Sequence, residues 1–326
     1  MYRIIGISRA LSSAVIFFAL GGCSLWQSDA SSENSGNRAN FDAARFEETA
    51  AFRGWDYLVN RLKTRGLSEA ELVSIYGNAR MPKFEHISFS LNPKESSAIY
   101  QQFLSPKNIA SARAFLTTHA HAFTIAENTF KVNRRAIAAV LLVETRFGKD
   151  TGRELVVWKL SRLAGISDPE NVRWNFERLR RDDPAVKFED VQIRAQYLDA
   201  IFLPEVEALF QIAKAQNLDL FRFTGSSAGA FGMPQFLPTS YLKFGVDGNR
   251  DGVISLFREE DAIHSVANFL SKSGWDNSNP ESQKNALWKY NRSSAYVGAV
   301  LKIAELLAPR KSTGHSVKTV SQPKTR

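Results

Sequence analysis

Glu144 is the residue in this chain whose surroundings most clearly favour proton chemistry. It follows a run of apolar residues, Ala136 to Val143, that leaves no polar face on a helix, so we expect this helix to be buried on all sides. A carboxyl group beside such a wall loses hydration, which raises its pKa and lets it hold a proton at neutral pH. A general acid needs such a proton. The alternative is a buried structural acid paired with a cation such as Arg146.

The expected bounds of this helix follow from the residues at its two ends. Asn133 can accept a hydrogen bond from a free backbone amide, which predicts an N-cap. Gly148 can adopt a left-handed conformation, which predicts the closing turn. Glu144 should therefore lie in the last turn of the helix.

A second segment, Gly225 to Gln235, consists mainly of small residues that neither helix nor strand propensity explains. Such a segment allows a ligand to approach the backbone closely. Taken alone, it is equally compatible with a tight turn between two helices.

The segment from Asp247 to Arg258 fits the first half of an EF-hand calcium loop. Oxygen ligands would come from Asp247, Asn249, Asp251 and the carbonyl of Val253. Position twelve is Arg258, which cannot bind calcium. The alternative is a turn rich in Asp, Asn and Gly.

The rest of the chain is patterned for helices. Apolar residues recur at helical spacing over residues 46–62, 109–130, 155–163, 172–179 and 190–215, and Ser68 with Glu71 predicts a capping box for a short helix through Ile75. Residues 80–96 lack this period and permit one short extended segment. The hydrophobic fraction of 44% is ample for a large core. The sequence thus predicts a mainly α fold with little or no β-sheet.

Four motifs occur in order along the chain: V-E-T-R-F-G at 143–148, G-S-S-A-G-A-F-G-M-P-Q-F-L-P-T-S at 225–240, D-A-I-H-S-V-A-N-F-L at 261–270 and K-Y-N-R-S-S-A-Y-V at 289–297. Together they resemble the motif set of the membrane-bound lytic murein transglycosylase B family (glycoside hydrolase family 103). The resemblance covers about residues 55–307. It implies a lysozyme-like helical transglycosylase fold with an additional helical N-terminal region.

The resemblance also implies an activity. That activity is cleavage of the β-1,4 bond between N-acetylmuramic acid and N-acetylglucosamine in peptidoglycan, with formation of 1,6-anhydromuramic acid ends. The family's single catalytic glutamate matches Glu144, which would act first as acid and then as base. Cleft-lining positions match Ser226 and Gln235, where Ser226 would orient the glutamate and Gln235 would bond a sugar.

Further family positions match residues near the C-terminus and in the calcium loop. The family's saccharide contacts match Tyr290, Asn291 and Tyr296. For the two tyrosines, packing in the core is the alternative. The family's calcium loop is longer than an EF-hand, and its last carboxylate matches Asp261. The resemblance implies a structural calcium ion and no organic cofactor.

The N-terminus predicts export. Residues 1–23 combine Arg3 and Arg9 with an apolar stretch too short to span a bilayer, which is typical of a signal peptide. The signal ends in L-G-G-C, which looks like a bacterial lipobox, and Cys23 is the only cysteine of the chain. We therefore expect lipidation at Cys23, and Ser24 after it favours the outer membrane and a periplasm-facing protein. An ordinary signal peptide that happens to end near a cysteine is the alternative.

The predicted domain order follows from these segments. A signal peptide over 1–23 precedes a flexible tether over 24–40, a helical catalytic domain over 41–308 and a basic disordered tail over 309–326. Much of the formal charge of +9 lies in the signal and the tail, so the charge does not by itself indicate nucleic acid. The expected partners are peptidoglycan strands and a lipid bilayer. A hydrolytic muramidase and a non-catalytic wall-binding lipoprotein remain as alternative functions.

Overall fold

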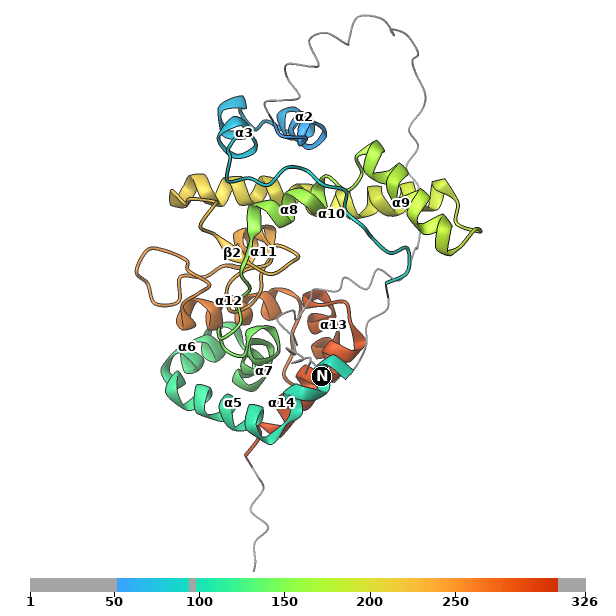
Figure 1. Cartoon of the computed structure of the whole chain (residues 1–326). Helices are drawn as coiled ribbons and strands as arrows, with labels where there is room; N and C mark the ends of the chain where they lie inside the picture. Colours follow the sequence, from blue (N-terminus) through green and yellow to red (C-terminus); the bar gives the residue numbers. More distant parts are fainter. Residues whose placement is uncertain (1–51, 94–97, 310–326) are drawn as a thin grey trace, which may run out of the picture.

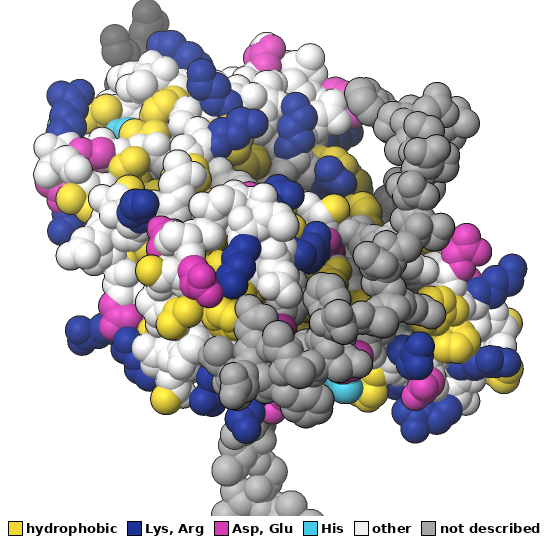
Figure 2. Space-filling model, turned by 90° about the horizontal axis from the view of Figure 1, so that it is seen from above, with side chains coloured by type: hydrophobic (Ala, Val, Ile, Leu, Met, Phe, Trp, Pro, Cys, Tyr) yellow, Lys and Arg dark blue, Asp and Glu magenta, His cyan; other side chains and the backbone are white. Residues whose placement is uncertain are grey.

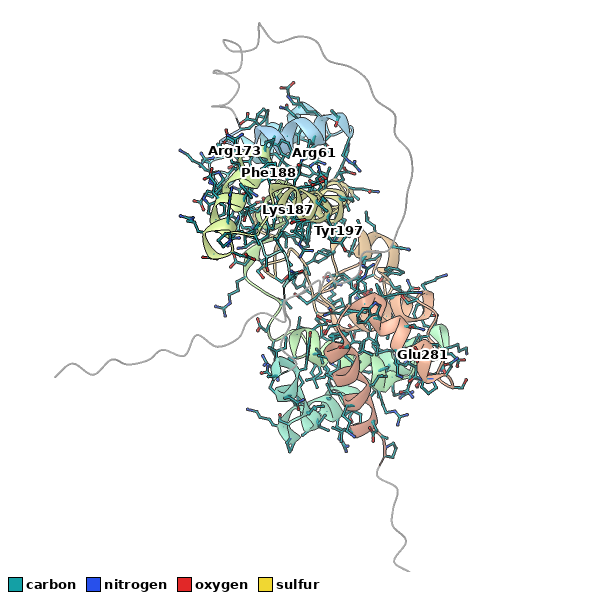
Figure 3. All side chains as sticks on the ribbon, turned by 90° about the vertical axis from the view of Figure 1, so that its right-hand side faces the viewer. Arg61, Arg173, Lys187, Phe188, Tyr197 and Glu281 are labelled. Carbon is teal, nitrogen blue, oxygen red and sulfur yellow. The ribbon has the colours of Figure 1, made fainter. Side chains whose placement is uncertain are left out.

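The structure is a computed structural model that describes residues 52–93 and 98–309. The predicted signal peptide, the tether and nearly all of the predicted tail lie outside these ranges. The described chain forms two groups of helices, an upper lobe and a lower lobe in the view of Figure 1, joined by the segment around β2 and α11. From the side, Arg61, Arg173 and Tyr197 lie on the upper lobe and Glu281 on the lower lobe (Figure 3).

The upper lobe is built around one long helix. Its members are α2 (Asp56–Thr64), α3 (Glu69–Tyr76), α8 (Val156–Ala164), α9 (Pro169–Asp182) and α10 (Phe188–Gln216). Helix α10 packs on both α8 and α9. The expected capping box at Ser68 and Glu71 is present at the start of α3. Asp168 caps α9 by accepting a hydrogen bond from the Glu170 amide.

The lower lobe surrounds the helix that carries Glu144. Its members are α4 (Ala98–Gln101), η1 (Gln102–Leu104), α5 (Pro106–Thr118), α6 (Ala120–Phe130), α7 (Arg134–Thr145), α12 (Glu259–Lys272), α13 (Pro280–Tyr290) and α14 (Ser294–Leu306). Helices α5, α6, α12 and α14 all contact α7, which explains why an all-apolar sequence is stable there.

One expected helix is divided in two. The sequence pattern runs from Ile109 to Phe130, but the structure ends α5 at Thr118 and begins α6 at Ala120. The backbone of His119, between the two helices, is not helical, with φ −104° and ψ 28°. The centroid of its ring lies 4.4 Å from that of Phe115. Apolar spacing continues across this break because both helices face the same core.

The segment that enters the lower lobe from the upper lobe has no regular secondary structure up to residue 93. It is held to α9 by side-chain amides in place of a neighbouring strand. The Ile87 amide donates to Asn171 (2.7 Å), the Phe89 amide donates to Asn175 (3.2 Å), and Asn175 donates to the Ile87 carbonyl (2.8 Å). Both asparagines are fully buried, so they satisfy backbone groups that water cannot reach.

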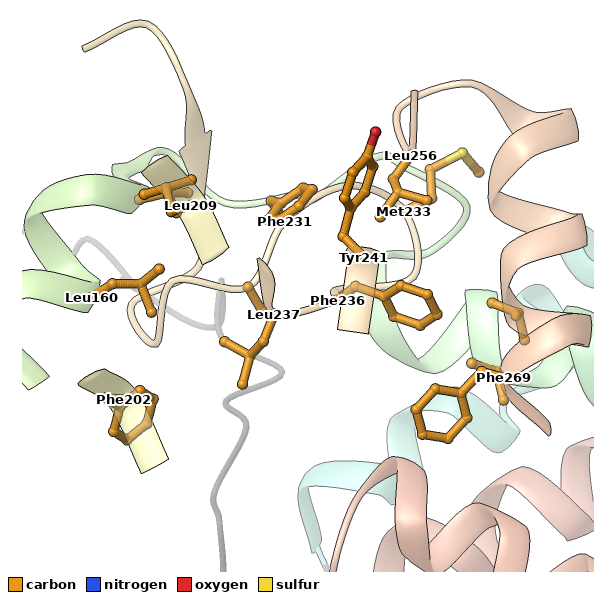
Figure 4. Close-up of a cluster of buried hydrophobic side chains, with 14 of the residues drawn as sticks. Leu160, Phe202, Leu209, Phe231, Met233, Phe236, Leu237, Tyr241, Leu256 and Phe269 are labelled. Carbon is orange, nitrogen blue, oxygen red and sulfur yellow. The ribbon is translucent and has the colours of Figure 1, made fainter. Parts of the chain in front are cut away.

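The lobes meet on a shared core. Strand β1 (Glu154–Leu155) pairs antiparallel with β2 (Thr224–Gly225), and α11 (Pro238–Phe244) contacts both α10 and α12. Figure 4 shows the cluster between them: Leu160, Phe202 and Leu209 come from the upper lobe, Phe269 from the lower lobe, and Phe231, Met233, Phe236, Leu237, Tyr241 and Leu256 from the joining segment. The small-residue segment is therefore buried between the lobes and connects them.

A buried carboxylate strengthens this connection. Glu205, in the middle of α10, accepts hydrogen bonds from the Thr239 amide (2.8 Å) and hydroxyl (2.6 Å) at the start of α11. Burial raises the pKa of Glu205, and the two bonds from Thr239 act in the opposite direction. Glu205 thus fixes the end of the joining segment to the upper lobe.

The described residues are mainly helical, with a single two-stranded sheet, which confirms the predicted fold class. Seen from above, Lys and Arg side chains are spread among Asp and Glu side chains and form no continuous basic patch on this face (Figure 2). Among the described residues, no helix combines the length and apolar character that a bilayer crossing requires.

Candidate active site

Helix α7 places Glu144 at the edge of a dry core. Asn133 caps the helix as predicted, accepting a hydrogen bond from the Arg135 amide. Every residue from Ala136 to Thr145 is buried, and Glu144 keeps only 7% of its surface exposed. The helix ends earlier than Gly148: Arg146 (φ 49°) and Phe147 (φ 62°) already adopt left-handed conformations. The closing turn therefore begins directly after Thr145.

Tyr296 provides the hydrogen bond to Glu144. Its hydroxyl donates to Glu144 Oε1 over 2.7 Å. Tyr296 stands in the first turn of α14, whose cap Ser293 accepts a hydrogen bond from the Tyr296 amide. Burial raises the pKa of Glu144 to about 8, although the bond from Tyr296 acts in the opposite direction. The carboxyl group therefore holds a proton at neutral pH.

Three tyrosines form one cluster beside this carboxyl group. The ring of Tyr296 stacks on Tyr290, with centroids 6.2 Å apart, and meets Tyr100 edge to face at 5.9 Å. The Tyr290 hydroxyl donates to the Pro234 carbonyl over 2.6 Å. Burial raises the pKa of both Tyr290 and Tyr296, so these two side chains stay neutral beside Glu144.

The small-residue segment lies against the end of α7. The Thr145 hydroxyl, one residue after Glu144, donates to the Met233 carbonyl over 2.8 Å. A close approach at Gly152 requires glycine, because a Cβ there would lie 2.0 Å from the Gly225 carbonyl oxygen. The segment that resembles the family's cleft motif and the helix that carries Glu144 are thus joined by direct contacts.

Ser226 and Gln235 lie in this segment but bind the backbone. The Ser226 hydroxyl accepts from the Ala230 amide (3.2 Å), and Gln235 Nε2 donates to the carbonyls of Gly232 (2.9 Å) and Thr151 (3.2 Å). In the described part of the chain neither forms a hydrogen bond with Glu144. The side chain that bonds Glu144 here is that of Tyr296, and the orienting role of Ser226 stays a prediction. Among residues 52–93 and 98–309, no donor bonds the Oε1 atom of Gln235.

The three residues expected to touch saccharide differ in their exposure. Tyr296 is only 1% exposed, so its ring has no free face on which a pyranose could stack. Tyr290 is half-buried, and Asn291 ends α13 with a half-buried side chain. Tyr296 is thus buried against Glu144, in keeping with the core-packing alternative. The saccharide contacts of Tyr290 and Asn291 stay predictions.

The predicted calcium residues gather in one loop. Asp261 is fully buried at the start of α12, where its carboxylate accepts from the amides of Gly248 (2.8 Å) and Ser255 (2.7 Å). Asp247 accepts from the amides of Asp251 (3.2 Å) and Gly252 (2.8 Å). These oxygens are of the type that calcium prefers, and Asn249 and Val253 belong to the same turn.

The loop as it stands is not arranged around a cation. The carboxylates face backbone amides, and Asp251 pairs with the guanidinium of Arg258. Within residues 52–93 and 98–309, no three Asp, Glu, His or Cys side chains converge closely enough to hold a metal ion. The oxygen atoms of these residues are suitable calcium ligands, but in this structure they do not point at a common centre. The calcium site therefore stays a prediction.

Two features of this site were not apparent from the sequence. The hydrogen bond between Tyr296 and Glu144 joins residues 152 positions apart. Arg146, offered as a partner for Glu144, instead donates to the Gln102 side chain over 2.8 Å. The doubled tyrosines of the K-Y-N-R-S-S-A-Y motif were the only local signal, and they did not specify which ring would meet the carboxyl group.

Comparisons of the sequence and of the fold found similar proteins. Residues 52–284 match the model of the transglycosylase SLT domain. The membrane-bound lytic murein transglycosylase B of Escherichia coli (strain K12) is 31% identical over 175 residues, which cover 54% of this chain. The matched part spans only 41% of the length of that relative.

Solved structures share the fold. The lytic transglycosylase Slt35 of Escherichia coli in complex with bulgecin A matches with a TM-score of 0.58 at 20% identity, over 78% of this chain and 92% of that one. The soluble lytic transglycosylase SltB1 of Pseudomonas aeruginosa matches with a TM-score of 0.57 at 21% identity, over 78% and 98%. SltB3 of Pseudomonas aeruginosa, in complex with NAG-anhNAM-pentapeptide, matches with a TM-score of 0.56 at 18% identity, over 78% of each chain. With its matched domain, its helical fold and the contact between α7 and the small-residue segment, this chain belongs to the transglycosylase SLT domain family.

Proposed function

We propose that this protein is a peptidoglycan lytic transglycosylase that cuts the β-1,4 bond between N-acetylmuramic acid and N-acetylglucosamine. The observation that carries the proposal is the Glu144 carboxyl group, which is buried, accepts a hydrogen bond from Tyr296 and has its pKa raised by burial to about 8. The names of its relatives, lytic transglycosylases in each case, support the reaction class. Peptidoglycan as substrate is supported by the muropeptide bound to SltB3.

The proposed reaction uses one carboxyl group twice, first as an acid and then as a base. The Glu144 carboxyl group donates its proton to the glycosidic oxygen, and the bond from that oxygen to the muramyl C1 breaks, which releases the N-acetylglucosamine hydroxyl. The Glu144 carboxylate then removes the proton of the muramyl C6 hydroxyl, and O6 bonds to C1. This closes the 1,6-anhydro ring and returns Glu144 to its protonated form. No water is consumed.

A single carboxyl group distinguishes this reaction from ordinary glycoside hydrolysis, which uses two carboxyl groups at a fixed separation. The pKa of Glu144 is set by its burial and by Tyr296, and no second carboxylate among the described residues contributes. The names of the relatives, lytic transglycosylases, favour ring closure over hydrolysis. Mass spectrometry of purified sacculi digested by the protein separates the two. Anhydromuramic ends are expected, whereas reducing muramic ends would identify the hydrolytic muramidase.

Tyr296→Phe provides a test of the effect of Tyr296 on Glu144. The hydroxyl of Tyr296 stabilises the ionised form of Glu144, so its removal should raise the pKa of Glu144 above its value of about 8. Because the acid step needs protonated Glu144, the alkaline limb of the pH–rate profile should move to higher pH. The turnover number should fall about tenfold, since the carboxyl group also loses its fixed orientation. An unchanged alkaline limb would show that Tyr296 does not act on Glu144.

A lipid anchor would place the enzyme at the inner face of the outer membrane. This part of the proposal rests on the L-G-G-C sequence ending at Cys23 and on the membrane-bound relative. Several acyl chains on one cysteine hold a protein firmly on a bilayer. Cys23→Ala should therefore move the protein from the membrane fraction to the soluble fraction and remove labelling by a palmitate analogue. Labelling that survives this substitution would rule out Cys23 as the anchor.

Calcium binding is a further part of the proposal. Its ligands would be the side chains of Asp247, Asn249, Asp251 and Asp261 and the Val253 carbonyl, and its role would be to stabilise the loop before α12. It is supported by two carboxylates of the loop, a third in the first turn of α12, and the oxygen-only donor set.

A further inference from the structure

Arg258 is the only cation that forms an ion pair within the calcium loop in the described part of the chain. Its guanidinium contacts Asp251 Oδ2, the oxygen that also accepts from the Asn249 side chain. The other oxygen of Asp251 accepts from the Val253 amide. Both oxygens of this carboxylate are therefore already bound by groups of the protein itself.

The neighbouring carboxylates need no positive partner. Asp261 accepts backbone amides on both oxygens, and so does Asp247. Asp251 is thus the carboxylate of the loop that a positive side chain, that of Arg258, neutralises. A divalent cation at the predicted site would need this same carboxylate.

The ion pair between Arg258 and Asp251 is exposed enough for a cation from solution to displace it. The Arg258 side chain is 52% exposed and the Asp251 side chain 35% exposed, and pairs of this kind hold weakly because water and salt screen them. Arg258 is the N-cap residue of α12 but makes no side-chain cap hydrogen bond, so its side chain can leave Asp251 without breaking the helix start.

We infer that Arg258 is an internal cation of this loop that competes with calcium for Asp251, an inference that rests on the proposed calcium site. Arg258 holds the loop when calcium is scarce and weakens calcium binding through its own positive charge. For calcium to bind, the guanidinium of Arg258 must first leave Asp251. The guanidinium then lies close to a divalent cation of the same charge sign. Both the lost ion pair and this repulsion oppose calcium binding.

The test is calorimetric titration of the full-length protein with calcium chloride after removal of divalent ions by a chelator. Arg258→Gln should bind calcium about tenfold more tightly than the unaltered protein, which corresponds to about 1.4 kcal/mol. Asp251→Ala should abolish binding in either background. Arg250→Gln is the matched control: it removes the same charge from the same loop, and Arg250 forms no ion pair with a described residue. Its calcium affinity should change by less than about threefold, because an exposed charge without a partner acts only through screened repulsion.

Melting temperature gives a second measurement that does not depend on activity. In chelator, Arg258→Gln should melt at or slightly below the unaltered protein, because the loop has lost its internal cation. In saturating calcium the order should reverse. If both proteins bind calcium with affinities within twofold, or if Arg250→Gln tightens binding as much as Arg258→Gln, the competition is absent while the calcium site stands. If neither protein binds calcium, both the site and the competition are overturned.

Discussion

Glu144→Gln is expected to lower the rate of glycan cleavage by about 10³-fold, within the range usual for loss of general acid–base catalysis. The amide matches the carboxyl group in shape, and its oxygen can still accept the hydrogen bond from Tyr296. It has no proton to donate and cannot take one from the C6 hydroxyl. Both proton transfers are therefore lost together, while the surrounding contacts are kept.

The measurement is release of soluble muropeptides from purified sacculi, with sedimentation of the protein with sacculi as the measure of binding. Binding by Glu144→Gln should remain near that of the unaltered protein. Glu281→Gln is the control, because Glu281 lies on the exposed surface of the lower lobe (Figure 3) and its side chain pairs, among the described residues, with the exposed Lys284 alone. Cleavage by Glu144→Gln at the normal rate would favour the non-catalytic wall-binding protein or a different acid.

The second large effect concerns stability and pH. The folded-state pKa of Glu144 is about 8, above the value of 4.5 for the exposed side chain. Between these values the folded protein retains a proton that the unfolded chain has released, so the carboxyl group destabilises the fold increasingly as pH rises from 4.5 to 8. The cost is absent below this window and complete above it. One pKa unit corresponds to about 1.4 kcal/mol, so the full cost is on the order of a few kcal/mol.

Glu144→Gln should therefore raise the melting temperature by several degrees at pH 9 and by almost nothing at pH 4. Thermal unfolding across this range measures the difference. Glu281→Gln should change the melting temperature little at any pH, since exposed substitutions of this kind usually alter stability by less than about 0.5 kcal/mol. An equal gain for Glu144→Gln at both ends of the pH range would mean that Glu144 is ionised in the folded protein and that its burial carries no such cost.

Local signals in the sequence were enough to predict most of the helices. The cap at Asn133 and the capping box at Ser68 depend on residues two or three positions apart, and the structure has both. The burial of Glu144 was predictable for the same reason, because eight apolar neighbours precede it in the chain. The division at His119 was not predictable, since the apolar spacing of α5 and α6 continues across it.

Contacts between distant residues limited what the sequence could predict about the site. Tyr296 reaches Glu144 only because α14 packs against α7, and an apolar pattern on each helix does not specify which polar atom meets which. The sequence of residues 84–89 permitted a short extended segment but did not indicate its partners. These partners are asparagine side chains of α9, and a strand pattern does not predict them. The small-residue segment suggested a ligand approach, and the structure shows that it also packs as the core between the lobes (Figure 4).

The central claim is that one buried carboxyl group keeps its proton at neutral pH and supplies it to the reaction. Infrared difference spectra between the unaltered protein and Glu144→Gln measure this directly, because a protonated carboxyl group absorbs apart from a carboxylate. The account predicts a protonated Glu144 band at pH 6 that disappears with a midpoint near pH 8. A Glu144 carboxylate band already complete at pH 6 would contradict it.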